Sequence, residues 1–245
     1  RAVDLNIHTS PMVRRNKTIG ILAFIQDISE RKRSIERIRY MAYYDDMTGL
    51  PNRQFFMNRL EERLLSAQTN GTSLAVCYID VDQFKLVNAS FGRDFGDMLL
   101  LQIAERLSRT LSEPGDLARM EGDEFAACLD GLQSADEATD RLNGLMAVMD
   151  EPFELNGIPV HITVSIGVAL SKSGSDDAGT LLKRADTALH RVKENGKNDY
   201  MMHSGDMDPI ALKKLTIQHD LRKALQNREF VLYYQPQYDL ASGQI

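Results

Sequence analysis

The sequence predicts an α+β fold in which helices cover a mainly antiparallel sheet. The apolar run 74–79 has the length and composition of a buried strand, and two apolar segments within 117–129 flank a glycine turn, as in a hairpin. The segments 96–111, 134–149 and 180–194 carry apolar residues at helical spacing. This order fits an α/β sandwich of the ferredoxin-like or polymerase-palm plan, with the hairpin and the first strand at its centre.

The first part of the chain predicts a strand followed by a helix. The strand is expected over 18–26, where most residues are apolar. Asp27 and Glu30 have the spacing of a helix N-cap and its capping-box partner, which predicts a helix over 28–43. The apolar positions of this helix have coiled-coil spacing, which would suit the pairing of two chains: Ile28, Ile35, Ile38 and Ala42.

A compact domain is expected to begin near Tyr43. The turn-rich segment 45–52 precedes a helix marked by Phe56, Leu60 and Leu64, and the strand 73–81 follows. Besides the three helices above, the compact domain is expected to contain a hairpin turn at Glu121-Gly122 and strands over 153–155 and 160–170. Beyond Lys197 the sequence predicts a linker, then a helix over 210–227 and a strand over 230–237.

Composition narrows the range of functions. The chain has 245 residues and a formal net charge of -6, which gives no general affinity for nucleic acid or anionic lipid. Cys77 and Cys128 lie in apolar strand-like runs, so we expect core thiols and a reducing, cytoplasmic compartment. The longest apolar run, 19–25, is far shorter than the ~20 residues that cross a bilayer, so we expect no membrane contact by this stretch. Because the chain begins with Arg1, we expect a fragment whose parent could carry an anchor elsewhere.

Acidic residues gather at two predicted strand ends. Asp80 and Asp82 end the first apolar strand, and Asp123 and Glu124 follow the glycine of the hairpin turn. If these strands are neighbours in the sheet, the carboxylates meet and can bind a hard cation. A D-x-D at a strand end is by itself more often a solvated terminus than a metal site, so the inference depends on the wider pattern.

That wider pattern consists of four motifs. They are DDMTGLPNR at 45–53, DVDQFKLVN at 80–88, RMEGDEF at 119–125 and KENGKN at 193–198. Together they resemble the GGDEF family of diguanylate cyclases over residues 43–202. The resemblance implies the GGDEF fold and the condensation of two GTP molecules into cyclic di-GMP with release of pyrophosphate. It also implies a homodimer, in which each protomer supplies one half-site.

The resemblance assigns a metal site and a catalytic site. Asp80, the backbone carbonyl of Val81, Asp123 and Glu124 match the family's ligands for two Mg²⁺ or Mn²⁺ ions per active site. Asp80, Asp123 and Glu124 are also the implied catalytic residues, with Glu124 a further ligand or a proton acceptor. Ions at this place would neutralise triphosphate charge and activate the 3′-hydroxyl for in-line attack.

Further positions match contacts to the nucleotide. Asn88 and Asp97 match the guanine readers, since a carboxylate accepts hydrogen bonds from guanine N–H groups and an amide can bond elsewhere on the base edge. From the residues alone, either could be a helix cap and the lysines a solvated surface. Arg119 matches the arginine before the signature, with no role assigned. The other substrate-binding positions implied by the resemblance are Phe84, Lys85, Gly122, Lys193 and Lys197.

The sequence departs from the family pattern at the signature itself. Glu121 replaces its first glycine, in a tight turn where positive φ is often required and a non-glycine residue then costs ~1 kcal/mol. Its carboxylate would also face an anionic triphosphate, so we expect weaker GTP binding. Ala89 and Arg93 depart from the pattern without touching the implied metal ligands. The product-inhibition motif RxxD is absent from 112–116, and we expect no feedback by cyclic di-GMP there.

The flanks resemble other signalling domains. Residues 1–27 resemble the C-terminal end of a PAS sensor domain, and residues 28–42 resemble a helical signalling linker. A GGDEF domain is expected over residues 43–204. Residues 205–245 resemble a linker followed by the truncated start of an EAL phosphodiesterase domain. The expected function is a diguanylate cyclase within a PAS-GGDEF-EAL protein. Two alternatives stay open: a degenerate GTP-binding domain that regulates the attached phosphodiesterase without catalysis, and a dimerisation module without a ligand.

Overall fold

The computed structural model describes most of the first 205 residues. The described residues are 3–14, 17–111, 113, 115–171, 176–205, 224 and 231. The chain divides into two units, Arg1–His203 and Ser204–Ile245. The helix expected over 210–227 and the strand expected over 230–237 belong to the second unit and lie almost entirely outside the described residues. Within the described ranges, no helix is long and apolar enough to span a membrane.

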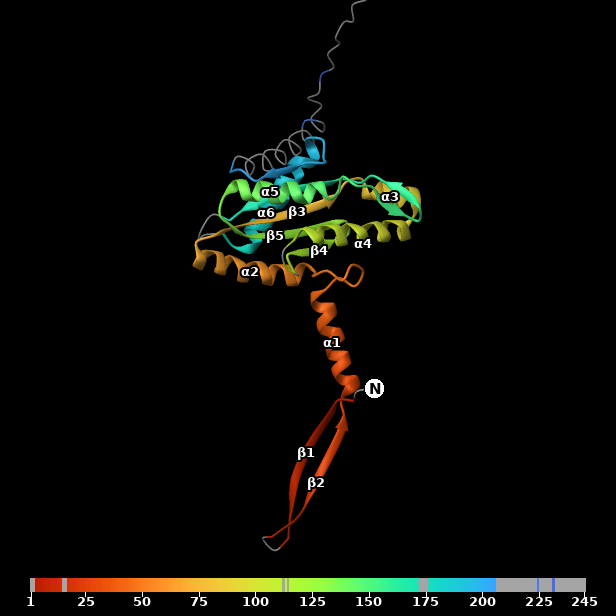
Figure 1. The fold of residues 1–245 in the computed structure, drawn as a ribbon, viewed down its shortest axis with the longest axis vertical. Helices are drawn as coiled ribbons and strands as arrows, with labels where there is room; N and C mark the ends of the chain where they lie inside the picture. Colours follow the sequence, from red (N-terminus) through yellow and green to blue (C-terminus); the bar gives the residue numbers. More distant parts are fainter. Residues whose placement is uncertain are drawn as a thin grey trace, which may run out of the picture. The chain divides into compact units, whose positions relative to one another are not determined.

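A five-stranded sheet forms the centre of the first unit, in the order β4-β5-β3-β8-β9 (Figure 1). Its strands are β4 Leu117–Glu121, β5 Glu124–Leu132, β3 Ser73–Val81, β8 Val164–Leu170 and β9 Tyr200–Met202. Every neighbouring pair is antiparallel except β8 and β9, which are parallel. The mainly antiparallel sheet with the first strand at its centre is confirmed, although β4 of the hairpin lies at the edge.

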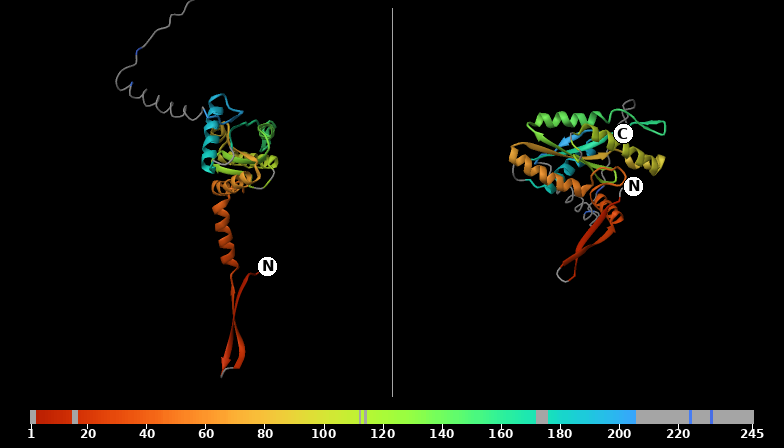
Figure 2. Two further views of the ribbon diagram at one scale, coloured as in Figure 1. Left: turned by 90° about the vertical axis from the view of Figure 1, so that its left-hand side faces the viewer. Right: turned by 60° about the horizontal axis from the view of Figure 1, so that its bottom comes forward.

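Helices cover both faces of this sheet (Figure 2). The helices α3 Phe84–Phe91, α4 Arg93–Thr110 and α5 Ala135–Ala147 pack on one face. The helices α2 Arg53–Asn70 and α6 Ala178–Glu194 pack on the other. The predicted α/β sandwich is therefore present, with the sheet as its middle layer.

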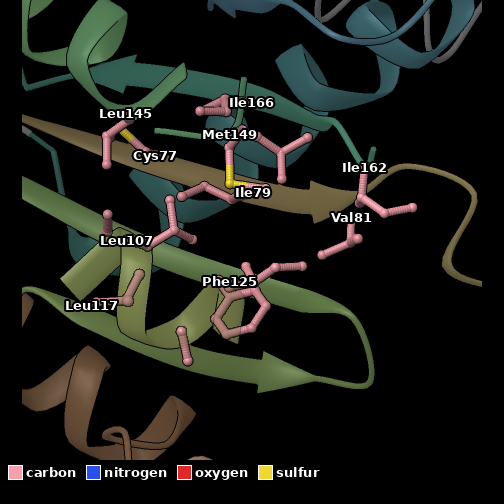
Figure 3. Close-up of a cluster of buried hydrophobic side chains, with 14 of the residues drawn as sticks. Cys77, Ile79, Val81, Leu107, Leu117, Phe125, Leu145, Met149, Ile162 and Ile166 are labelled. Carbon is pink, nitrogen blue, oxygen red and sulfur yellow. The ribbon is translucent and has the colours of Figure 1, made fainter. Parts of the chain in front are cut away.

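Alternating side chains of β3 contribute to two hydrophobic cores. Ala75, Cys77, Ile79 and Val81 belong to the core under α4 and α5, part of which Figure 3 shows. The side chains between them, Leu74, Val76 and Tyr78, belong to the core under α2 and α6. Because both faces are covered, the strand is a continuous apolar run without polar alternation.

The two cysteines are buried free thiols, as expected. The register pairs Cys77 with Ala127 and Cys128 with Val76, so the thiols point to opposite faces of the sheet. Burial raises the pKa of both thiols, that of Cys128 to about 12, which keeps them protonated and unreactive.

The backbones of β8 and α6 approach each other closely at Gly167. A Cβ atom at this position would lie 2.0 Å from the carbonyl oxygen of Ala185 and 2.2 Å from the backbone nitrogen of Leu189. Both neighbours are backbone atoms, which no side-chain rotation can move away. Glycine is therefore required for α6 to lie directly on the sheet, and α6 carries Lys193 one turn farther on.

A hairpin and a helix precede the sheet. The strand β2 Lys17–Asp27 and the helix α1 Ser29–Tyr43 confirm the predicted strand and helix. The strand β1 Leu5–Arg14, which pairs antiparallel with β2, is not predicted, and Pro11 within it is a residue that disfavours strands. The predicted capping by Asp27 is present in part: the helix begins one residue later than expected, with Ile28 at the N-cap position, and Oδ1 of Asp27 accepts a hydrogen bond from the N–H of Ser29 at 2.9 Å.

Local turns explain the other differences from the predicted elements. The helix α3 is an addition, and the helix predicted from residue 96 begins at Arg93. The strand predicted over 160–170 divides into β7 Ile158–Val160 and β8, and β7 forms a small hairpin with β6 Phe153–Leu155. Asn156 and Gly157 join these two strands with φ of 54° and 79°, the left-handed backbone that tight hairpin turns need.

Candidate active site

The ends of β3 and β5 bring the predicted acids together. Asp80 lies opposite Glu124 in the antiparallel register, so both share the sheet face that α2 and α6 cover. The N–H of Val81 donates to the carbonyl oxygen of Asp123 at 3.2 Å, which fixes the turn beside the end of β3. Opposite residues of such a pair have Cβ atoms about 4.5–5.5 Å apart. The carboxylates can therefore act on one ligand.

Lys193 of α6 places a positive charge against these acids. Its Nζ lies 2.6 Å from Oδ2 of Asp80, whose side chain is 12% exposed. Burial raises the pKa of Asp80, the Lys193 ammonium lowers it, and the negative charges of Asp123 and Glu124 raise it further. The resulting pKa lies above the ordinary value, so added positive charge at this place would favour the ionised acid.

The oxygen donors suit a hard cation, although they do not enclose a metal site. Carboxylates of Asp80, Asp123 and Glu124 and the carbonyl of Val81 are the ligand types that Mg²⁺ prefers. No three or more His, Cys, Asp or Glu side chains in the described part of the chain are arranged to hold a metal ion. Asp80 is paired with Lys193, and Oε2 of Glu124 accepts a hydrogen bond from the hydroxyl of Tyr78. The oxygen ligands therefore fit a Mg²⁺ ion in chemical type, and in this structure the ammonium of Lys193 balances the negative charge of Asp80.

Asp82 does not join this group, which corrects the interpretation of Asp80 and Asp82 as one acidic pair. Its side chain is buried and accepts hydrogen bonds from Oγ1 of Thr163 at 2.7 Å, Oγ of Ser165 at 2.8 Å and the N–H of Asn198 at 3.1 Å. Asp82 therefore attaches β8 and the loop after α6 to the end of β3, which makes it a positioning residue.

The side chain of Asn88 in α3 lies against Gly96 of α4. Its Oδ1 is buried and has no hydrogen-bond partner among the described residues. A Cβ atom at Gly96 would lie 1.9 Å from this oxygen and 3.1 Å from Cζ of Phe84, so glycine alone leaves it room. Asp97, the next residue of α4, is exposed. An unpaired buried acceptor is costly, and this one suits a site where a ligand supplies the donor.

The other predicted lysines lie in solvent. Lys85 is exposed on α3, beside buried Phe84. Lys197 is exposed in the loop after α6, where it has φ of 66° and its N–H donates to the carbonyl oxygen of Val192 at 3.0 Å. Of the three lysines predicted to bind substrate, the structure thus places Lys193 against the acids and leaves the side chains of the other two exposed.

The backbone of the signature turn differs from the prediction. Gly122 has φ of 58°, whereas Glu121 ends β4 and is not among the residues with positive φ. The predicted backbone strain at Glu121 is therefore wrong, because only the second signature position needs the left-handed conformation and that position is glycine. Glu121 is exposed, so what remains of its expected effect is electrostatic.

Arg119 joins the signature turn to the start of the domain. Its Nε and Nη2 donate to the carbonyl oxygen of Gly122 at 3.0 and 2.7 Å, and its Nη1 donates to Oδ1 of Asp45 at 2.9 Å. Burial raises the pKa of Asp45, but hydrogen bonds from Thr48 and the charge of Arg119 outweigh it and hold that pKa below its ordinary value. Arg119 therefore connects the segment that follows α1 to the turn that carries the acids.

Residues 42–199 match the family described as diguanylate cyclase, GGDEF domain. The chain belongs to the GGDEF family. Two solved GGDEF domains share its fold. That of TpbB, or YfiN, from Pseudomonas aeruginosa has a TM-score of 0.66 and 34% identity, and covers 69% of this chain and 99% of that one. The structure of the coiled coil and GGDEF domain of DgcB from Caulobacter crescentus, in complex with c-di-GMP, has a TM-score of 0.63 and 26% identity. The match covers 71% of this chain and 93% of the DgcB chain.

Two curated relatives of the GGDEF domain are named for reactions of cyclic di-GMP. MucR of P. aeruginosa, a bifunctional diguanylate cyclase/cyclic di-GMP phosphodiesterase, is 34% identical over 203 residues, which are 83% of this chain and 30% of MucR. NbdA of the same organism, a cyclic di-GMP phosphodiesterase, is 37% identical over 208 residues, which are 85% of this chain and 26% of NbdA. The chain thus spans less than a third of the length of these relatives.

Sequence reasoning missed Asp45 and Tyr78 as contributors to the GGDEF site and gave Arg119 no role. Asp45 and Arg119 are 74 residues apart and meet through an ion pair, which no local pattern reveals. Tyr78 is part of an apolar strand, and its contact with Glu124 depends on the register of two strands. The polar D-x-D spacing pointed to Asp82, although to the wrong role.

Arg119→Met is expected to lower GTP turnover by about 30–100-fold, because the carbonyl of Gly122 and the carboxylate of Asp45 both lose their partner and the acids of the turn move. Steady-state rates with GTP and Mg²⁺ measure the effect. The control is Arg109→Met, since Arg109 is exposed and pairs with Glu105 on its own helix. Equal rates for Arg119→Met and the wild type would show that the turn holds its shape without this link.

Glu121→Gly is expected to destabilise the GGDEF domain by about 0.5–1 kcal/mol, since glycine loses more backbone freedom in a strand. GTP affinity is expected to rise by no more than about threefold, because water and salt screen an exposed carboxylate. Thermal unfolding and GTP titration measure the two effects, with Glu154→Gly on an exposed position of β6 as control. A gain in affinity of about tenfold or more contradicts the screening argument.

Proposed function

We propose that the GGDEF domain is a diguanylate cyclase that condenses two GTP molecules into cyclic di-GMP and releases pyrophosphate. The observation that carries the proposal is the position of Asp80 opposite Glu124, with Asp123 at the adjoining turn and Lys193 against Asp80. Oxygen donors beside an ammonium group suit the binding and reaction of a metal-bound triphosphate.

The proposed reaction is an in-line phosphoryl transfer. The 3′-hydroxyl oxygen of one GTP attacks the α-phosphorus of the other, the bond to the pyrophosphate oxygen breaks, and the hydroxyl proton passes to a base, for which Glu124 is the candidate. Asp80, Asp123, Glu124 and the carbonyl of Val81 would hold Mg²⁺ or Mn²⁺, two ions per site, which would supply neutralisation of the triphosphate charge. Lys193 is placed to contact phosphate oxygens bound beside Asp80.

Recognition of guanine is assigned to Asn88 and Asp97. The unpaired buried oxygen of Asn88 needs a donor, which an N–H group of a base can supply, and exposed Asp97 can accept from others. Phe84 lies close to the same glycine as Asn88, and Lys85, Lys197 and the backbone at Gly122 are proposed to contact phosphates.

Catalysis in this proposal needs a homodimer, because each GTP is held by one protomer. The helix α1 suits that role, since Ile35, Ile38 and Met41 are exposed on it. We further propose that the hairpin β1-β2 ends a PAS domain, that residues 205–245 begin an EAL domain, and that the protein works in the cytoplasm.

The test is incubation of the protein with GTP and Mg²⁺, with identification of the product by mass spectrometry. Cyclic di-GMP and pyrophosphate in a 1:2 ratio are expected from the atom balance of the reaction. No cyclic di-GMP at high protein concentration, where dimers form, contradicts the proposal.

A second candidate is a GTP-binding domain that regulates an attached phosphodiesterase without catalysis. The extra carboxylate of Glu121 favours it, and the relative NbdA is named as a cyclic di-GMP phosphodiesterase. Under this proposal, GTP binds and changes the hydrolysis of cyclic di-GMP by the longer protein while no cyclic product forms. Failure to bind GTP excludes it.

A further inference from the structure

Tyr78 contacts Glu124 across two neighbouring strands. It lies two residues before Asp80 in β3, and therefore on the same face of the sheet as Asp80 and Glu124. Its hydroxyl donates a hydrogen bond to Oε2 of Glu124 at 2.9 Å. Its residue is 7% exposed, and its ring packs in the core under α2 and α6, so the hydroxyl is held in place by the packing of the ring.

The carboxylate of Glu124 has another direction open to it. A groove of about 480 Å³ between α2 and α6 is lined by Tyr78 and Glu124 together with Arg53, Lys183, Asp186 and His190. A glutamate side chain has several rotatable bonds, so an unrestrained carboxylate can turn into this groove, where Arg53 and Lys183 attract it and Asp186 repels it. The hydrogen bond from the Tyr78 hydroxyl opposes this rotation of the Glu124 side chain. The other carboxylate oxygen of Glu124, Oε1, accepts no hydrogen bond from the described residues and remains available for a ligand.

We infer that Tyr78 is a positioning residue for Glu124, and this inference rests on the proposed cyclase function. The hydrogen bond to Oε2 fixes the carboxylate in one orientation and leaves Oε1 for a ligand of the proposed site. Hydrogen bonds to charged groups are stronger than those between neutral groups, so this contact can hold Glu124 against the attraction of Arg53 and Lys183.

The test is Tyr78→Phe, which keeps the ring and removes the hydroxyl. Mn²⁺ is expected to bind about tenfold more weakly in the presence of 3′-deoxy-GTP, which has no 3′-hydroxyl to react, as measured from the electron paramagnetic resonance of free Mn²⁺. With GTP and Mg²⁺, kcat is expected to fall about tenfold while KM stays within about twofold. Tyr200→Phe, in a partly buried tyrosine of the same sheet, is the control and is expected to change neither quantity.

A double-mutant cycle with Glu124→Gln separates positioning from packing. If Tyr78 acts through Glu124, adding Tyr78→Phe to Glu124→Gln weakens Mn²⁺ binding little further. Additive losses, unchanged Mn²⁺ affinity in Tyr78→Phe, or a wild-type protein that binds no Mn²⁺ overturns the inference. A wild-type protein that forms no cyclic product contradicts the proposed function instead, and the Mn²⁺ titration still decides the role of Tyr78.

Discussion

Asp123→Asn is expected to lower the rate of cyclic di-GMP formation by about 10²–10³-fold and to leave the protein folded. The amide has the shape of the carboxylate but not its charge, so it binds a hard cation poorly. The hydrogen bond from Val81 to Asp123 uses the backbone carbonyl and survives the substitution. We therefore expect the free energy of unfolding to change by less than about 0.5 kcal/mol.

Two measurements on the same preparation check this result: the initial rate of cyclic di-GMP formation from GTP and Mg²⁺, and thermal unfolding. Asp150→Asn is the matched control, because Asp150 is exposed and lies after α5, away from the candidate site. It is expected to retain the wild-type rate. Retention of that rate by Asp123→Asn would remove Asp123 from the proposed reaction.

Gly167→Ala is expected to destabilise the GGDEF domain by more than about 3 kcal/mol, a large part of the ~5–15 kcal/mol that keeps a domain folded. The added methyl group would overlap the carbonyl oxygen of Ala185 and the nitrogen of Leu189. The helix α6 must therefore move off β8, which opens the core under α2 and α6 and carries Lys193 away from Asp80.

Chemical denaturation with urea measures the change in the free energy of unfolding. Gly144→Ala is the control, since Gly144 lies on an exposed position of α5 and a Cβ there meets no atom within 4 Å. That substitution is expected to stabilise the protein by up to about 1 kcal/mol, because alanine is the better helix former. Equal stability of Gly167→Ala and the wild type would mean that α6 can shift without loss.

Local patterns in the sequence predicted the main elements of the fold. The apolar run of β3, the hairpin of β4 and β5, and the helical spacing in α6 each depend on residues close in the chain, and the structure confirms all three. The same holds for the approach of Asp80 to the signature turn, because the two strands that carry these acids are neighbours in the sheet.

Features that depend on distant contacts could not be predicted. The strand β9 has three residues and is set by its pairing with β8. The helix α3 was missed for a local reason, because its N-cap Gln83 has a left-handed backbone that its residue type does not suggest. The conformation of Glu121 is decided by which residue of the turn takes positive φ, and in this structure that residue is Gly122. Partners of polar side chains depend on the finished topology in the same way, as the ion pair between Asp45 and Arg119 shows.

The hydrogen bonds of Asp82 bear on the order in which the domain can be completed during synthesis. Its partners Thr163 and Asn198 follow it by 81 and 116 residues. A nascent chain that has not yet emerged past residue 163 offers this carboxylate none of these partners, and one that ends before residue 198 lacks the N–H of Asn198, so the carboxylate must stay hydrated or incompletely bonded. The end of β3, where Asp80 of the proposed cyclase site lies, therefore gains its full set of anchoring hydrogen bonds only when the loop before β9 has been made.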